Sequence, residues 1–205
     1  IHSVASPEER AHHITRIVGV VSACAARIYR HSKELPHVEP DPERPFIEDV
    51  ASTLLEEELG AHPVVAKALD VLFILHADHE QNCSANVMRS IASGGADPYT
   101  ALSGATGALY GPAHGGANEA VLEMLTTIGS VDQVADYVER AKKKEHRLMG
   151  IGHPVYRHYD PRAALIKEVA YEVFEVTGRN DLIDIALEME RVVLEDEYFT
   201  SRRLN

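Results

Sequence analysis

Cysteine, tryptophan and long apolar runs are scarce or absent in this chain of 205 residues. The 2 cysteines, Cys24 and Cys83, have neither a metal-binding nor a redox spacing, which excludes a disulfide scaffold and indicates free thiols in a reducing compartment. The strongest candidate for a membrane span, VLFIL, runs directly into the polar HADHE and is far too short. We see no signal peptide, and we therefore expect a cytoplasmic protein that is not embedded in a membrane.

Positively charged residues are also few: there are 20 Lys and Arg against 32 Asp and Glu, which gives a formal net charge of -12. An acidic surface repels phosphate backbones and anionic lipids, so we expect neither nucleic acid nor a membrane as a partner. A small anionic ligand would need the few cations to be concentrated at one place. The positions of the arginines and lysines are therefore informative.

Alternating strand patterns are missing as well, whereas apolar residues recur at helical spacing along almost the whole chain. The first helix should start at Pro7, because Ser6 and Glu9 have the spacing of a capping box. One face of this helix is apolar and is expected to pack; its residues are Ile14, Ile17, Val18, Val21, Ala25 and Ile28. The chain is predicted to be all-α.

Further helix boundaries follow from capping residues, prolines and glycines. Ser84 is expected to cap one helix, and Asp160 to cap another that has Pro161 in its first turn. The helices are expected over residues 46–60, 63–79, 85–93, 98–110, 117–128, 131–144, 161–177 and 180–199.

Three polar clusters stand out from this helical pattern, and the first is LHADHEQN. His76 and His79 lie about one helical turn apart and share a face. The simplest interpretation is a polar helix end with a buried histidine that is hydrogen-bonded to a neighbour. A second is a metal site built from His76, Asp78, His79 and Glu80, because imidazole and carboxylate groups at helical spacing bind zinc or iron. A third is a site for an organic anion.

The second cluster is GPAHGGAN, in which His114 stands among glycines just before a predicted helix. Glycine at positions 111, 115 and 116 allows either a close approach to a ligand or a positive φ. The positive end of the following helix disfavours an imidazolium ion, and a neutral imidazole N–H is suited to donate to a carbonyl oxygen that becomes an enolate. The alternative is a glycine turn with an incidental surface histidine.

The third cluster is RLMGIGHPVYRHYDPRA. Arg162 falls in the first turn of the helix that Asp160 starts, where a cation is unfavourable unless an anion docks on it. A guanidinium holds a carboxylate through two parallel hydrogen bonds. His153 lies in the glycine-flanked loop upstream. The lysines of the preceding KKKEHR are either a solvated helix end or neighbours of a phosphate-bearing ligand near Gly150 and Gly152.

Together, these clusters suit a small polycarboxylate that is held beside a group to be enolised. Histidines supply neutral donors and proton transfer, and the arginine supplies the positive charge. The predicted reaction is the formation of a carbon–carbon bond between a carbonyl acceptor and an activated acyl donor.

LHADHEQN, GPAHGGAN and GIGHPVYRHYDPRA, in this order, resemble the signature segments of the citrate synthase family. The resemblance covers most of the chain and is weakest before about Pro63. It implies a helical fold in which a small domain closes over a large one. Residues 1–115 would then be the C-terminal side of the large domain, and residues 116–205 most of the small domain. A homodimer or a higher homo-oligomer is implied too.

The resemblance implies that acetyl-CoA condenses with oxaloacetate to citrate and CoA, through an enol and citryl-CoA, at the entry to the tricarboxylic acid cycle. His79 and Arg162 would bind oxaloacetate together with the two catalytic histidines. Of these, His114 would stabilise the enol, and His153 would polarise the ketone and protonate it. The loop that meets CoA would consist of Leu148, Met149, Gly150, Ile151 and Gly152. No metal is implied, and no cofactor besides acetyl-CoA as a substrate.

The chain departs from the family in three ways. The family's general base is an aspartate in a segment resembling NVDFYSG, and these 205 residues contain no such segment. Further carboxylate-binding arginines nearer the C-terminus are missing too, and Pro154 stands where many members have arginine. We therefore expect an internal fragment that is nearly inactive alone and that self-associates through helix faces meant for burial.

Other interpretations stay open at this point. A 2-methylcitrate synthase would use propionyl-CoA, and one methylene gives only about 1–3 kcal/mol of discrimination. A metal-dependent hydrolase would use the first cluster, and its signature would be tightly bound zinc or iron. A non-catalytic helical module would not bind oxaloacetate.

Overall fold

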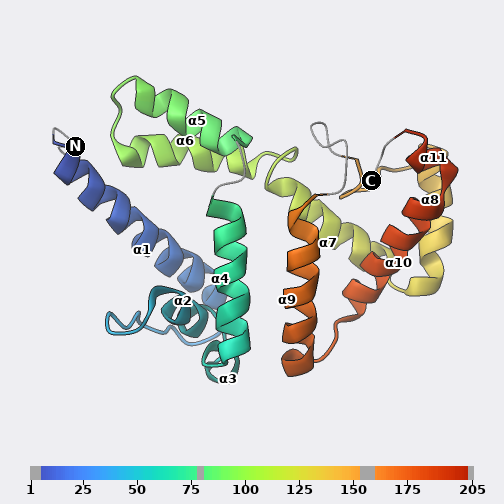
Figure 1. Ribbon diagram of the computed structural model, residues 1–205, viewed down its shortest axis with the longest axis horizontal. Coiled ribbons are helices and arrows are strands. Elements are labelled where there is room, and N and C mark those ends of the chain that lie inside the picture. Colours follow the sequence, from blue (N-terminus) through green and yellow to red (C-terminus); the bar gives the residue numbers. More distant parts are fainter. Residues whose placement is uncertain (1–5, 78–80, 153–159, 203–205) are drawn as a thin grey trace. The chain divides into compact units, whose positions relative to one another are not determined.

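The computed structural model describes residues 6–77, 81–152 and 160–202 (Figure 1). Every regular element in these ranges is a helix, which confirms the all-α prediction. The chain divides into two compact units, one of residues 1–108 with 166–177 and one of residues 109–165 with 178–205. The assignment of residues 1–115 and 116–205 to a large and a small domain stays a prediction. No helix in the described ranges is both long enough and apolar enough to span a membrane.

The first unit contains five complete helices and most of two others. The complete helices are α1 (Pro7–Ser32), α2 (Phe46–Leu54), α3 (Glu57–Gly60), α4 (Pro63–Ala77) and α5 (Cys83–Ser93), and the others are α6 (Pro98–Tyr110) and α9 (Arg162–Thr177). The predicted capping box starts α1, where Ser6 Oγ accepts from Glu9 N at 3.1 Å and Glu9 Oε2 accepts from Ser6 N at 3.2 Å.

Two predicted features of this unit are wrong in detail. The helix expected over residues 46–60 is two helices, because the backbone is extended at Leu55 and Glu56 between α2 and α3. The cap of α5 is Asn82 rather than Ser84. Asn82 Oδ1 accepts from Ala85 N at 2.9 Å, and the Ser84 hydroxyl only donates to the same oxygen. The amide oxygen of Asn82, two positions earlier, is better placed to accept from the N–H groups of the first helical turn.

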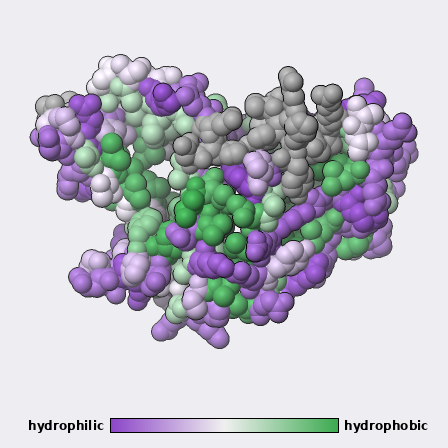
Figure 2. All heavy atoms as spheres, in the orientation of Figure 1, coloured by the Kyte–Doolittle hydropathy of each residue, from purple (hydrophilic) through white to green (hydrophobic). Residues whose placement is uncertain are grey.

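The apolar face predicted for α1 is present, but most of it is exposed rather than packed. Ile28 is 69% exposed, and Ile14, Val18 and Val21 are each about half exposed. The buried positions of this helix are Ala26 and Arg30. Figure 2 shows that apolar side chains, in green, reach the visible surface of the molecule. The periodicity identified the helix correctly and its packing wrongly.

Arg30 fastens the end of α1 to the loop and helix that follow. Its side chain is buried and donates from Nε to Pro36 O and from Nη1 to Leu55 O at 2.6 Å. Leu55 directly follows α2, so one guanidinium holds the C-terminal ends of two helices together.

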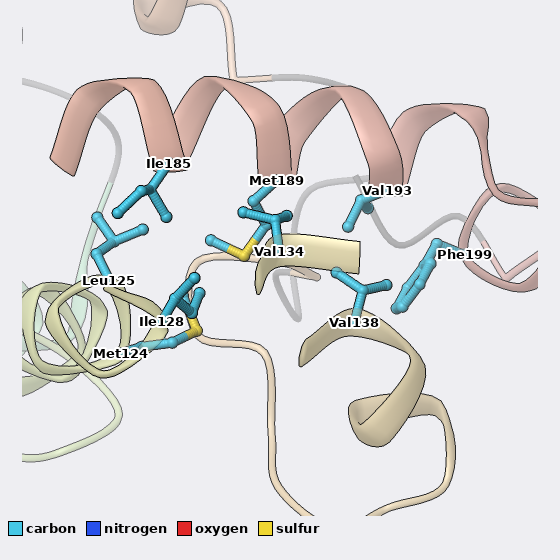
Figure 3. Close-up of a cluster of buried hydrophobic side chains, with 9 residues drawn as sticks. All are labelled: Met124, Leu125, Ile128, Val134, Val138, Ile185, Met189, Val193 and Phe199. Atoms are coloured by element: carbon cyan, nitrogen blue, oxygen red, sulfur yellow. The ribbon is translucent and has the colours of Figure 1, made fainter. Parts of the chain in front are cut away.

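The second unit is built from α7 (Gly116–Ile128), η1 (Val131–Gln133), α8 (Val134–Lys142), α10 (Asp181–Glu195) and α11 (Glu197–Thr200). Their inward faces meet in one apolar cluster, in which the side chains of α10 point toward those of α8 and α7 (Figure 3). The cluster consists of Met124, Leu125, Ile128, Val134, Val138, Ile185, Met189, Val193 and Phe199. Burying a side chain of this size stabilises a fold by roughly 1.5–3 kcal/mol.

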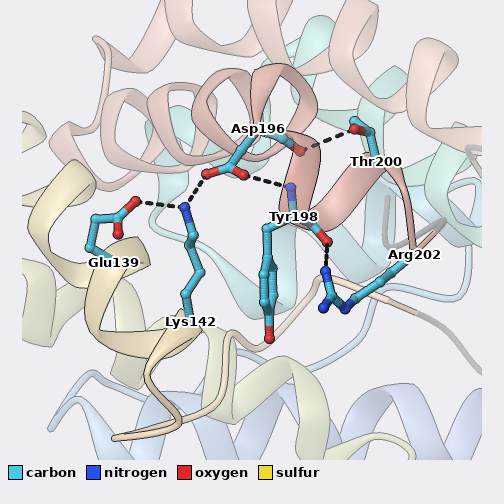
Figure 4. Close-up of polar contacts among 6 residues, drawn as sticks. All are labelled: Glu139, Lys142, Asp196, Tyr198, Thr200 and Arg202. Carbon is cyan, nitrogen blue, oxygen red and sulfur yellow. Dashed lines mark hydrogen bonds and ion pairs between the residues drawn. The ribbon is translucent and has the colours of Figure 1, made fainter.

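A polar clamp, which we define as Lys142, Asp196 and Tyr198, joins the end of α8 to the start of α11. Lys142 Nζ donates to Asp196 Oδ2 and to Glu139 Oε1, both at 2.7 Å (Figure 4). Asp196 also caps α11 by accepting from Tyr198 N at 2.8 Å. Arg202 covers the Tyr198 ring at 3.9 Å from its centroid. The hydrogen bond with Asp196, followed by that with Glu139, raises the pKa of Lys142.

Candidate functional site

His114 lies where α6 ends and α7 begins, in the turn of residues 111–115. Its backbone N–H donates to Gly111 O at 3.0 Å, and its carbonyl accepts from Ala117 N at 3.0 Å. The half-buried side chain therefore leaves the backbone immediately before the first turn of α7. This is the position, beside the positive end of a helix, that the sequence predicted.

The glycines around His114 do not have the positive φ that was one of the two options expected, and the other option, close approach to a ligand, stays a prediction. None of Gly111, Gly115 and Gly116 is among the described residues with positive φ, and Gly115 has φ −60°. A Cβ on Gly115 would lie 2.5 Å from Leu109 O, and one on Gly116 would lie 3.1 Å from Gly111 O. The start of α7 packs directly against the last carbonyls before it. Glycine is needed here for close backbone packing rather than for an unusual φ.

The predicted CoA loop, Leu148–Gly152, combines anchored side chains with exposed glycines. Leu148, Met149 and Ile151 pack against the apolar cluster of the second unit. Gly150 and Gly152 have φ +82° and +77°, a conformation that favours glycine. The positive φ of these two glycines was not predicted from the sequence, and their backbone lies at the surface.

The structure brings this loop onto the helix that starts beside His114. Met149 N lies 3.3 Å from the sulfur of Met124, and a Cβ on Gly150 would lie 3.3 Å from Val121 Cγ2. Both partners belong to α7. Val121 is five residues after Gly116, or roughly 7.5 Å along the helix axis. The loop and His114 are therefore two parts of one local arrangement.

Arg162 occupies the first turn of α9, as predicted, but a carboxylate of the chain already docks on it. Its Nη2 donates to Asp160 Oδ2 at 2.8 Å, and its Nε donates to Asp160 Oδ1 at 3.1 Å. The same Oδ1 accepts from the Arg162 backbone N–H at 2.9 Å. The bidentate geometry expected for a ligand carboxylate thus exists within the chain. A ligand would share or replace the contact with Asp160.

His76 lies in the last turn of α4 and is exposed, so it is not the buried histidine expected in this cluster. Its Nδ1 lies 2.6 Å from Leu72 O, one turn earlier, so the ring donates to its own helix. The predicted residues Asp78, His79, Glu80, His153 and Pro154 lie outside the described residues. In the described ranges no group of three or more His, Cys, Asp or Glu side chains could hold a metal ion.

Sequence reasoning missed two features next to the CoA loop. One is the polar clamp, because an ion pair between residues 142 and 196 has no local signal. The other is His146, whose ring stacks on Tyr137 with centroids 3.9 Å apart. His146 is part of the KKKEHR segment that drew attention only for its lysines. One of its lysines, Lys142, is in fact paired with Asp196, and its Glu145 is paired with Arg140 of α8.

Known proteins similar to this chain agree with one another. The family model "Citrate synthase, C-terminal domain" matches residues 2–205. The peroxisomal citrate synthase of Dictyostelium discoideum is 49% identical over 202 residues, which are 97% of this chain and 41% of that protein. The glyoxysomal citrate synthase of Cucurbita maxima is 45% identical over 202 residues, 97% of this chain and 39% of that protein. The chain thus spans about two fifths of the length of these curated relatives.

The fold is similar to solved structures under the same name. Citrate synthase from Thermoplasma acidophilum, in a ternary complex with carboxymethyl coenzyme A and oxaloacetate, has a TM-score of 0.79 and 26% identity. The match covers 97% of this chain and 52% of that one. These comparisons give no support to a metal-dependent hydrolase or to a non-catalytic helical module. With a family model over nearly its whole length, the chain belongs to the citrate synthase family.

Proposed function

We propose that the full-length protein condenses acetyl-CoA with oxaloacetate to form citrate and CoA. The observation that carries this proposal is that His114 lies directly before α7 while the loop Leu148–Gly152 packs against the same helix. The second unit thereby contains both the imidazole of His114, which can donate to a thioester carbonyl, and the exposed glycine backbone that would bind CoA. Similar proteins are citrate synthases by name.

In the proposed reaction a base removes a proton from the methyl group of acetyl-CoA. The imidazole of His114 donates to the thioester oxygen and stabilises the enol that forms. The enol carbon then bonds to the ketone carbon of oxaloacetate, and His153 donates a proton to the ketone oxygen. Water hydrolyses the resulting citryl-CoA thioester to citrate and the free thiol. Stabilising charge as it develops is the largest single contribution to such catalysis.

For oxaloacetate binding we propose His79 and Arg162 as partners of its carboxylate groups, alongside His114 and His153. The bidentate contact between Arg162 and Asp160 supports this. A guanidinium group that binds one carboxylate through two hydrogen bonds can bind another carboxylate in the same way. The reaction as proposed needs no metal and no cofactor besides the substrate acetyl-CoA.

The test is the release of thiol from acetyl-CoA in the presence of oxaloacetate, with propionyl-CoA in parallel. The full-length protein should turn over, and these 205 residues alone should be nearly inactive. An absent general base costs on the order of 10²–10⁴-fold. In the full-length protein, His114→Asn should lower the rate of thiol release by a comparable factor. His31 is an exposed histidine at the end of α1, and His31→Ala should leave that rate unchanged.

Each other outcome has a distinct meaning. A preference for propionyl-CoA would identify a 2-methylcitrate synthase. Folded full-length protein that releases no thiol from either donor would refute the proposal.

We also propose that the full-length protein is a homodimer or a higher homo-oligomer, and that the 205-residue chain self-associates. The support is the exposed apolar face of α1. Light scattering should show a mass above the monomer's 22.6 kDa, and Val18→Glu with Ile28→Glu should lower it. A clean wild-type monomer would contradict self-association.

For the compartment, the peroxisomal and glyoxysomal names of two relatives favour an organelle over the cytoplasm that composition alone suggested. Imaging of the tagged full-length protein with a peroxisomal marker would decide between the two.

A further inference from the structure

The chain between α8 and the loop Leu148–Gly152 starts with a tightly closed turn. Lys144 has a positive φ of 65°, its N–H donates to Ala141 O at 2.9 Å, and Glu145 N donates to Arg140 O at 3.2 Å. This is the hydrogen-bond pattern of a Schellman motif. Arg140 returns the contact by donating from Nε to Glu145 Oε2 at 2.9 Å. The chain therefore leaves α8 in a defined direction.

His146 is the next anchor, and it makes two contacts with one residue. Its Nε2 lies 3.0 Å from Tyr137 O, and because a carbonyl only accepts, Nε2 must carry the proton. Its ring stacks on the Tyr137 ring with centroids 3.9 Å apart and planes tilted by 37°. Both side chains are half-buried, and Tyr137 packs against the apolar cluster. The core of the unit is thus connected to a residue two positions before Leu148.

After His146 the described anchors are weaker. Leu148, Met149 and Ile151 are partly buried against the cluster, and the contact of Met149 N is with a thioether sulfur, a poor acceptor. Apolar packing fixes such side chains without fixing the direction of their peptide groups. Among these contacts, the hydrogen bond of His146 is the strong polar contact nearest to the exposed glycines.

We propose that His146 is a positioning residue for the acyl-CoA loop. By holding the start of the loop on Tyr137, it presents the backbone around Gly150 and Gly152 in the orientation that binds the carrier of the acyl group. The inference rests on the proposed function, because that function assigns the loop to CoA. His146 itself does not contact the substrate in this proposal.

The variants separate the two contacts. His146→Phe keeps an aromatic ring for the stack and loses the hydrogen bond, whereas His146→Ala loses both. His31→Ala serves as the matched control. In the full-length enzyme, KM for acetyl-CoA should rise roughly 10-fold in His146→Ala, the value of one lost hydrogen bond with its packing, and less in His146→Phe. KM for oxaloacetate should stay near that of wild type, and the melting temperature should fall by only a few degrees, the cost of one hydrogen bond and one stack.

A purely structural role would give a different result. Equal losses for both substrates together with a larger fall in melting temperature, or an unchanged KM for acetyl-CoA, would overturn the proposal.

Hydrogen exchange on the 205-residue chain tests the anchor independently of catalysis. Amides 148–152 should exchange faster in His146→Ala, while those of α10 should not change. Unchanged exchange in the loop would overturn the proposal even if activity fell. Wild-type enzyme without thiol release would instead refute the proposed function, and the exchange measurement would still decide whether His146 holds the loop.

Discussion

The two units of the chain bury very different kinds of side chain. In the described part of the first unit the buried apolar residues are all alanine or valine, and they are Ala26, Val50, Ala51, Val65, Ala68, Ala101 and Ala105. In the second unit isoleucine, leucine, methionine and phenylalanine meet in one cluster. The large apolar side chains of α1 are exposed instead. The second unit therefore has a core of large apolar side chains, whereas the first has apolar surface suited to a partner.

The largest expected effect is a contrast between two isoleucines. Ile185, 1% exposed in the second unit, should lose about 2–5 kcal/mol of unfolding free energy on replacement by alanine, because a cavity forms in a packed cluster. Ile28→Ala in α1, 69% exposed, should change it by less than about 0.5 kcal/mol in the monomer. Denaturant unfolding at low protein concentration measures both. Similar losses of unfolding free energy in Ile185→Ala and Ile28→Ala would show that the apolar face of α1 is packed in solution.

Two glycines give the next contrast. Gly115→Ala should destabilise the second unit by about 1–3 kcal/mol, because its Cβ would lie 2.5 Å from a backbone oxygen that cannot move freely. Gly107→Ala in α6 has nothing within 4 Å of its Cβ and should stabilise by up to about 1 kcal/mol. The melting temperatures of the two variants, relative to wild type, test this. A Gly115→Ala variant as stable as wild type would contradict the crowding at the start of α7.

The acid response of the second unit should depend on the polar clamp. The hydrogen bond from Lys142 lowers the pKa of Asp196 below its ordinary 3.8. A carboxyl with a lowered folded-state pKa contributes stability that is complete above 3.8 and is lost as pH falls through the folded-state pKa. Asp196→Asn should therefore be less stable than wild type at pH 7, and the difference should shrink below about pH 4. Unfolding curves between pH 2 and about 7 measure this, and a constant difference would contradict the clamp.

The smallest effects are expected at two helix ends, one in each unit. Glu34 and Lys144 have positive φ of 56° and 65°, where L-residues are strained and glycine is not. Glu34→Gly and Lys144→Gly should each stabilise by up to about 1 kcal/mol. If the two units unfold in separate transitions, each substitution should raise the unfolding midpoint of the unit that contains it and leave the other midpoint unchanged. A loss of stability in either would mean that its side chain contributes more than the strain costs.

Local signals predicted much of the fold correctly. The capping box at Ser6 and the start of α9 after Asp160 involve residues within three positions of each other, so the sequence contains all the relevant chemistry. Gly150 and Gly152 were expected in a loop, but their positive φ was not predicted.

Features that depend on how particular groups meet in three dimensions could not be predicted from the sequence. Periodicity shows that α1 has an apolar face, but not what covers it. The role of Gly115 depends on the carbonyl of Leu109, and the clamp depends on residues 142 and 196 meeting. Asp160 was recognised as a cap but not as the partner of the Arg162 guanidinium, because one carboxylate performs both tasks.

The backbone crowding before α7 also affects how related genes should be compared. Any replacement of glycine by another amino acid adds a Cβ, and at positions 115 and 116 that carbon would meet main-chain atoms. Purifying selection for folding would therefore retain both glycines even in a descendant that had lost all turnover. The neighbouring His114 is the informative position, because asparagine or glutamine can replace it without adding a backbone clash. A histidine retained at position 114 across divergent genes would indicate selection for catalysis. The adjacent glycines would indicate only selection for folding.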